Sequence, residues 1–134
     1  MQLDPRQQHL ILVDTSIWVD HLRSGDAQLN ALLEQNKVVT HPFVVGEIAC
    51  GSLKNRALIF ELLHDLPSAV VAEANEVLSF VEHHKLHGKG IGYVDAHLLA
   101  STVLSDVAKL WSRDKRLQAM AELFGCAFQA TSVH

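Results

Sequence analysis

The sequence predicts an α/β domain whose largely parallel sheet is covered by helices on both faces. Short apolar runs of strand length alternate along the chain with longer segments of helical periodicity, as in strands joined by crossover helices. The chain has 134 residues, 49% apolar and 19% charged, which suits one soluble domain with a sizeable core. No linker, repeat or low-complexity segment interrupts the sequence. We therefore expect one domain at residues 9–134, after an N-terminal extension at residues 1–8.

In the first half of the chain, turn and capping residues separate the predicted elements. Asp14 closes the first apolar run, Ser24-Gly25 breaks a helical stretch in two, and Pro42 stands at a position favoured at helix starts. The predicted elements are a strand at His9–Val13, helices at Thr15–Leu22 and Asp26–Gln35, a strand at Val38–His41, and helices at Phe43–Lys54 and Ala57–Leu66.

In the second half, Pro67 follows a helix, and Ser68–Ala72 is either a brief extended segment or a loop. A glycine cluster at Gly88, Gly90 and Gly92 ends the next helix. The predicted elements are helices at Glu73–His87 and Tyr93–Leu104, a strand at Ala108–Trp111, a helix at Lys115–Phe124, and a final strand at Cys126–Gln129. Periodicity does not give the order of the strands in the sheet.

Composition argues against a membrane or secreted protein. No apolar run reaches the roughly 18 to 20 residues that a membrane span needs, and the N-terminus lacks the features of a secretory signal. The two cysteines, Cys50 and Cys126, make a poor disulfide framework, and both are expected to be small core residues. These observations favour a reducing, cytoplasmic location.

The formal charge of −4 comes from 15 acidic and 11 basic residues. Nucleic-acid-binding proteins are usually basic, so this balance at first disfavours RNA. However, setting aside four acids that surround divalent cations leaves 15 − 4 = 11 acids against 11 bases. Net charge therefore excludes neither class of protein.

Four carboxylates lie near the predicted edge of the sheet where such folds bind ligands, beyond the carboxyl ends of the strands. Asp14 directly follows the first strand, and Asp114 comes just after the third. Asp95 falls in the first turn of a helix, past the glycine cluster, and Glu47 lies inside an otherwise apolar run. These four residues are the candidate site.

Each acid also has a purely structural interpretation. Asp14 and Asp114 suit helix N-caps, and Asp95 suits the positive end of a helix dipole. Glu47 lies on or beside the stripe predicted to be buried, where an unpaired carboxylate is costly, and Gly46 would allow other backbone to come close. A buried arginine–glutamate pair is the alternative explanation for Glu47, whereas a shared cation would satisfy all four acids.

Carboxylate ligands without a thiolate suit Mg²⁺ or Mn²⁺ rather than zinc. Such a site is usual for phosphodiester hydrolysis, because the metal activates water and neutralises charge on the phosphate. Ser16 and Ser112 are candidates for positioning the water, the metal or the phosphate, with helix capping as their alternative role.

At these residues the sequence resembles PIN-domain ribonucleases, and within them the VapC-type toxins of bacterial type II toxin–antitoxin pairs. The resemblance covers residues from about 10 to 129, and four motifs occur in the family's order. The motifs are Val13–Arg23 (VDTSIWVDHLR), Glu47–Arg56 (EIACGSLKNR), Gly90–Ala100 (GIGYVDAHLLA) and Leu110–Leu117 (LWSRDKRL).

The resemblance implies a three-layer α/β/α fold with a central, mostly parallel sheet of about five strands. It implies that Asp14, Glu47, Asp95 and Asp114 are the family's catalytic, metal-binding acids, with Ser112 at a position where the family often has threonine. It further implies a Mg²⁺- or Mn²⁺-dependent endoribonuclease that forms a homodimer and is inhibited by a cognate, DNA-binding VapB-type antitoxin.

Other residues are weaker candidates. Lys89, Arg113 and Arg116 are candidates for RNA phosphate contacts, or else are solvated surface charges. His83 and His87 could share a helix face as a zinc pair, but a solvated helix end is favoured. For His97 packing at the edge of the core is the expected role, and for Trp111 burial. Trp18 fits either internal packing or an apolar groove for an antitoxin helix.

Two other functions compete with the ribonuclease. A phosphotransfer domain, either a receiver or a haloacid-dehalogenase-like phosphatase, also has acids at strand ends. However, Ser16 stands where the phosphatase usually has its second aspartate. A degenerate binding or assembly module of the same fold is the non-enzyme alternative, and loss of one acid would favour it.

Overall fold

The structure, a computed structural model, describes residues 10–105 and 108–130. The proposed N-terminal extension at residues 1–8 lies outside these ranges, as does His9 of the first predicted strand. In chain order the elements are β1 (Leu10–Val13), α1 (Thr15–Ser24), α2 (Ala27–Glu34), β2 (Val38–Val39), α3 (Pro42–Cys50), α4 (Arg56–Asp65), α5 (Ala74–His83), α6 (Tyr93–Ser105), β3 (Ala108–Trp111) and α7 (Lys115–Leu123).

The sheet is parallel, with the strand order β2-β1-β3. In the central strand, Ile11 is in register with Val38 on one side and with Lys109 on the other. The expectation of about five strands was too high, because the described residues form three. Ser68–Ala72, predicted as an extended segment or a loop, and the predicted strand Cys126–Gln129 form single parallel bridges instead, Thr40 with Ser68 and Leu110 with Ala127.

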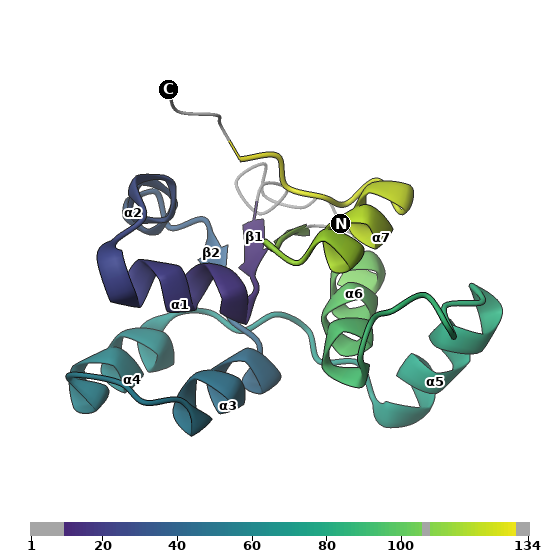
Figure 1. Cartoon of the computed structure of the whole chain (residues 1–134), viewed down its shortest axis with the longest axis horizontal. Coiled ribbons are helices and arrows are strands. Elements are labelled where there is room, and N and C mark those ends of the chain that lie inside the picture. Colours follow the sequence, from purple (N-terminus) through teal and green to yellow (C-terminus); the bar gives the residue numbers. More distant parts are fainter. Residues whose placement is uncertain (1–9, 106–107, 131–134) are drawn as a thin grey trace, which may run out of the picture.

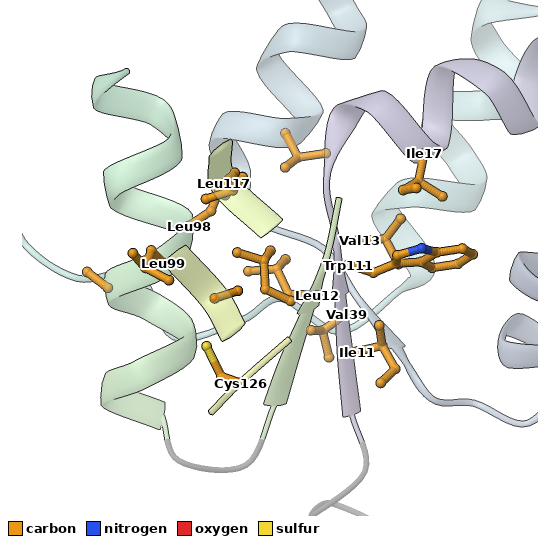
Figure 2. Close-up of a cluster of buried hydrophobic side chains, with 14 of the residues drawn as sticks. Ile11, Leu12, Val13, Ile17, Val39, Leu98, Leu99, Trp111, Leu117 and Cys126 are labelled. Carbon is orange, nitrogen blue, oxygen red and sulfur yellow. The ribbon is translucent and has the colours of Figure 1, made fainter. Parts of the chain in front are cut away.

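Helices cover both faces of this small sheet. Figure 1 shows α1 and α2 on one side of the strands and α5, α6 and α7 on the other, with α3 and α4 beyond α1. Successive side chains of β1 point to opposite faces of the sheet, so this strand packs against the helices on both faces. Leu12 points toward Leu98 and Leu99 of α6, while Ile11 and Val13 point to the opposite side (Figure 2). All five of these side chains are buried.

Capping residues explain where several helices begin and end. Asp14 and Asp26 are the N-caps of α1 and α2, and each accepts a backbone N–H through its side chain. Gly25, with a φ of 80°, ends α1 as the Ser24-Gly25 break predicted. Pro42 stands in the first turn of α3, as predicted.

Two helices are shorter than predicted, and one of the cysteine predictions was wrong. Helix α3 ends at Cys50 rather than at residue 54, and α5 ends at His83 rather than at residue 87. Cys126 is buried as expected, but Cys50 is exposed. The buried residues of α3 are Val44 and Ile48, and Cys50 lies two positions, or about 200°, around the helix from Ile48.

The remaining peripheral predictions can also be compared with the structure. Among the described residues, no helix is both long and apolar enough to cross a membrane. His83 and His87 are exposed, and His87 lies beyond the end of α5, so they do not share a helix face. Trp18 and Trp111 are buried. Trp18 therefore packs inside the molecule, and the interpretation of Trp18 as part of an antitoxin groove was wrong.

Candidate active site: four carboxylates at one edge of the sheet

Asp14 occupies the centre of the site, where β1 ends and α1 begins. Its backbone N–H donates to Trp111 O at 2.9 Å, which ties the end of β1 to the end of β3. The side chain is buried, with 6% of the residue exposed. Its Oδ1 accepts the backbone N–H of Thr15 at 2.7 Å, which makes Asp14 the N-cap of α1. The predicted capping role is therefore real, but it engages only one of the two oxygens.

The second oxygen of Asp14 accepts two hydroxyl donors. Ser16 Oγ donates to Asp14 Oδ2 at 3.0 Å, and the buried Ser112 Oγ donates to the same atom at 2.7 Å. Ser112 comes from the loop after β3, 98 positions from Asp14. Both serines named from the sequence therefore contact the first acid, and they fix the orientation of its carboxylate.

The loop that holds Ser112 also places Asp114. Ser112 Oγ accepts the backbone N–H of Asp114 at 3.0 Å, so one hydroxyl contacts both acidic positions. Asp114 Oδ1 in turn accepts the backbone N–H groups of Arg116 and Leu117, at 2.9 and 3.1 Å, as the N-cap of α7. Asp114 is exposed, so its carboxylate is accessible from solvent.

Glu47 reaches the site in a different way from the one predicted. It is exposed rather than buried, and a Cβ at Gly46 would meet nothing within 4 Å, so no backbone approaches there. In place of an arginine, Thr15 donates its hydroxyl to Glu47 Oε1 at 2.7 Å. Thr15 was not among the residues predicted for the site, although its position between Asp14 and Ser16 was the available signal.

Asp95 is the acid through which the four positions are electrostatically linked. Its Oδ2 accepts the backbone N–H of Gly92 at 3.1 Å, which fixes it in the first turn of α6. Burial raises the pKa of the Asp95 carboxyl above its ordinary value, and the Gly92 hydrogen bond partly opposes that rise. The negative charges of Asp14, Asp114 and Glu47 raise the Asp95 pKa further. The fold thus brings the charges of three distant segments within range of the Asp95 carboxylate.

The donor set suits a hard divalent cation, although the side chains do not enclose one. Within residues 10–105 and 108–130, no three His, Cys, Asp or Glu side chains are grouped closely enough to hold a metal ion between them. A magnesium ion does not need such a cage, because it usually keeps several waters and binds through one or two carboxylates. Each carboxylate also has about four lone-pair positions, more than the hydrogen bonds described above use.

The three basic candidates differ in their surroundings. Arg113 is tied down, with its Nε 3.0 Å from Asp20 Oδ2 and its Nη2 2.7 Å from Asp26 Oδ2. Its backbone N–H also donates to Ser16 Oγ at 3.1 Å. Arg116 and Lys89 are exposed, and the structure gives neither side chain an ion pair within the described residues. Arg113 therefore braces the loop against α1 and α2.

His97, two residues beyond Asp95, is 3% exposed and packs against aromatic rings. Its ring centroid lies 4.4 Å from that of Phe43 and 4.6 Å from that of Tyr93. Neither ring nitrogen has a hydrogen-bond partner in the part of the chain that is described. The expectation that His97 packs at the edge of the core is confirmed.

Two of the four acids, Glu47 and Asp114, are exposed at this edge of the sheet. A depression of about 640 Å³ lies beside the acids. A second depression, of about 520 Å³, lies away from them. The first is lined in part by Asp26, Trp111, Ser112 and Arg113, which are described above, and the second lies along α5. None of the four acids lines either depression. An exposed edge of this kind can admit a long polymer, which a closed pocket cannot.

Comparison with known proteins agrees with this geometry. A family model described as PIN domain matches residues 11–123, a range that contains all four acids. The chain belongs to the PIN-domain family. The parallel sheet with helices on both faces is the PIN fold, with its outer strands reduced to bridges. The resemblance drawn from the four sequence motifs is thereby confirmed.

Two relatives are similar over most of this PIN domain. Both are named Ribonuclease VapC32 and come from Mycobacterium tuberculosis, strains CDC 1551 / Oshkosh and ATCC 25618 / H37Rv. Each is 46% identical over 118 residues, which cover 88% of this chain and 95% of the relative. The similarity therefore extends over nearly the whole of those proteins and supports a VapC-type chain.

Proposed function

We propose that this chain is a metal-dependent endoribonuclease and acts as the toxin of a toxin–antitoxin pair. The observation that carries the proposal is geometric: Thr15 hydrogen-bonds both Asp14 and Glu47, and Ser112 hydrogen-bonds both the Asp14 carboxylate and the Asp114 backbone. Membership of the PIN family, and similarity to proteins named as VapC ribonucleases, support RNA as the substrate. The open edge at which the acids lie also suits a polymer.

In this proposal the four acids hold Mg²⁺ or Mn²⁺. Asp14, Glu47 and Asp95 bind one ion directly or through water, and Asp114 completes that shell or helps to hold a second ion. When bound, such an ion lowers the pKa of water and neutralises charge on the phosphate. The hydroxyls of Ser16 and Ser112 hold the Asp14 carboxylate in a fixed orientation, so that this ligand needs little rearrangement.

Water attacks the RNA phosphorus in line and expels the 3′ oxygen. The P–O3′ bond breaks, and the products carry a 5′-phosphate and a 3′-hydroxyl. This chemistry needs no histidine or serine nucleophile. It agrees with His97 being packed among rings and with both serines donating to a carboxylate.

The direct test uses purified, partner-free protein and total bacterial RNA. We expect discrete cuts with Mg²⁺ or Mn²⁺, none with EDTA, and none from an Asp95→Asn variant. The matched control is Glu61→Gln, an exposed acid in the middle of α4, which should cut like the wild type. Ends bearing a 2′,3′-cyclic phosphate would contradict the mechanism, because they require the RNA's own 2′-hydroxyl as the nucleophile.

The proposal includes a cognate VapB-type antitoxin, a homodimer and a cytoplasmic location. Exposed apolar side chains on α4 support a protein partner, with Leu58 67% and Leu62 39% exposed on one helix face. Co-expression with a cognate VapB-type antitoxin should yield a stable complex in which RNA cleavage is blocked. Purification of an active, partner-free chain from that co-expression would contradict the toxin–antitoxin assignment.

A further inference from the structure

Arg116 combines two features that set it apart from the other basic side chains near the acids. Its backbone N–H donates to Asp114 Oδ1 at 2.9 Å, so its backbone lies beside one of the four carboxylates. Its side chain is exposed, and among residues 10–105 and 108–130 it has no hydrogen-bond or ion-pair partner. Arg113, three positions earlier, has both Asp20 and Asp26 as partners.

The Arg116 side chain lies against the glycine loop that leads into α6. A Cβ built on Gly90 would stand 2.6 Å from Arg116 Cδ and 2.9 Å from both its Nε and its Nη1. These distances are shorter than any van der Waals contact, so the arginine occupies the place of a missing side chain. Gly90 also has a φ of +83°, a conformation that glycine adopts readily.

This contact places the guanidinium between two of the segments that carry the acids. Gly90 is two residues before Gly92, whose N–H donates to Asp95 Oδ2, and Arg116 is two residues after Asp114. A guanidinium has five N–H donors in a planar fork, a geometry that matches phosphate oxygens. Since no carboxylate within the described residues pairs with it, these donors are available to a ligand.

We propose that Arg116, seated over Gly90, contacts a phosphate of the RNA at the cleavage site, and that Gly90 is required because it makes room for this side chain. The inference rests on the proposed ribonuclease function. It separates two of the three basic candidates, because Arg113 braces the loop while Arg116 binds the substrate.

The first test compares Arg116→Met with Lys115→Met. Lys115 is the exposed neighbour at the start of α7, so each variant removes one positive charge from the same turn. We expect Arg116→Met to lower kcat/KM by about 10- to 100-fold, the range for loss of a hydrogen bond to a charged group. For RNA binding in EDTA, the slope of log affinity against log salt should fall by about 0.7, as for one lost phosphate contact on a single strand.

The second test uses a matched pair of glycines in one loop. Gly88→Ala and Gly90→Ala carry similar backbone strain, because the two φ values are +70° and +83°. A Cβ at position 88 meets nothing within 4 Å, whereas one at position 90 displaces Arg116. We expect Gly90→Ala to lose cleavage as Arg116→Met does and Gly88→Ala to keep it. In the Arg116→Met background, Gly90→Ala should cost no more activity than Gly88→Ala.

The outcomes separate the inference from the function on which it rests. If wild-type protein does not cut RNA with either metal, the ribonuclease proposal fails and the role of Arg116 fails with it. If the wild type cuts, and Arg116→Met matches Lys115→Met in both kcat/KM and salt slope, only the inference about Arg116 is overturned. Equal activity of Gly90→Ala and Gly88→Ala, at equal melting temperature, would overturn the role of Gly90.

Discussion

At the scale of single residues, each acid has a structural task and an electrostatic one. Asp14 and Asp114 cap helices, as their positions after strands predicted. The capping role places a carboxylate at the N-terminus of a helix, but it does not show which side chains from other segments lie beside that carboxylate. The information that the sequence lacked is tertiary, namely the hydroxyl of Ser112 against Asp14 and that of Thr15 against Glu47.

Ser112 offers the first prediction. Ser112→Ala removes a buried hydroxyl that donates to Asp14 and accepts from the Asp114 backbone. The variant should lose about 1–3 kcal/mol of unfolding free energy in urea, because both partners stay in place without it. RNA cleavage should also fall. Ser112→Thr keeps the hydroxyl and is the matched control, so equal behaviour of the two variants would contradict this role.

Asp95 offers the second prediction, in which a substitution raises the stability of the protein instead of lowering it. Its pKa is raised in the folded protein, so the folded state binds its proton more tightly than the unfolded state does. Stability from this group is therefore present at acid pH and is lost as pH rises through the folded-state pKa. At neutral pH, Asp95→Asn should raise the melting temperature of the metal-free protein by about 1–4 °C while abolishing cleavage.

The control for this measurement is again Glu61→Gln, which removes one charge remote from the site. If Asp95→Asn and Glu61→Gln shift the melting temperature equally at pH 7, neither the burial of the Asp95 carboxylate nor the charge of the neighbouring acids lowers the stability of the folded protein. A further check is the pH dependence. The stabilisation by Asp95→Asn should shrink as the pH is lowered toward the ordinary range of a carboxyl group.

At the scale of secondary-structure elements, the sequence predicted the central strands better than the edges. Ala108–Trp111 was predicted with the bounds that the structure has, and the polar residues Ser112, Arg113 and Asp114 directly follow it. The outer segments Ser68–Ala72 and Cys126–Gln129 have a sheet neighbour on one side only, and they form one bridge each. Apolar composition alone does not distinguish a full strand from such an edge segment.

Helix α3 illustrates the same limit for helical faces. Its sequence is apolar nearly all around, so it does not indicate which side is buried. The structure buries Val44 and Ile48 and leaves Glu47 exposed. The burial argument for Glu47 was wrong, whereas the family motif at Glu47–Arg56 also predicted that Glu47 belongs to the site. Its position near the other acids rests instead on the packing of α3 beside α1, where Thr15 reaches it.

His41 links two of these elements and gives a prediction for pH. Its Nδ1 accepts the Phe43 N–H at the start of α3, and its Nε2 lies 3.2 Å from Ser101 Oγ of α6. Burial, and secondarily the charge of His97, lower the pKa of His41 from 6.5 to about 4. Protonation therefore opposes folding. This stability is complete above pH 6.5 and is lost as pH falls toward 4.

The difference between 6.5 and about 4 corresponds to roughly 3 kcal/mol at most. His41→Asn keeps a cap acceptor at the start of α3 but has no proton to gain in this range. Its unfolding free energy should change less between pH 7 and pH 4.5 than that of the wild type. The exposed His83→Asn is the control, and a wild-type-like pH profile in His41→Asn would contradict the assignment.

At the scale of the whole molecule, the net charge of −4 is consistent with a site that concentrates negative charge. The fold brings acids from α1, α3, α6 and the start of α7 to one edge, although they are up to 100 positions apart in the sequence. The family's motifs predicted this meeting, whereas periodicity alone could not, because it gives no strand order. The arrangement raises the free energy of the metal-free protein, and a divalent cation should lower it.

Titration of Mn²⁺ into the RNA-free protein, followed by calorimetry, tests the four-acid site most directly. The series contains the wild type, four variants (Asp14→Asn, Glu47→Gln, Asp95→Asn and Asp114→Asn) and the Glu61→Gln control. We expect binding by the wild type and the control, and weaker binding by every one of the four variants. Wild-type binding that survives all four substitutions unchanged, in variants that remain folded, would contradict a shared metal site at this edge of the sheet.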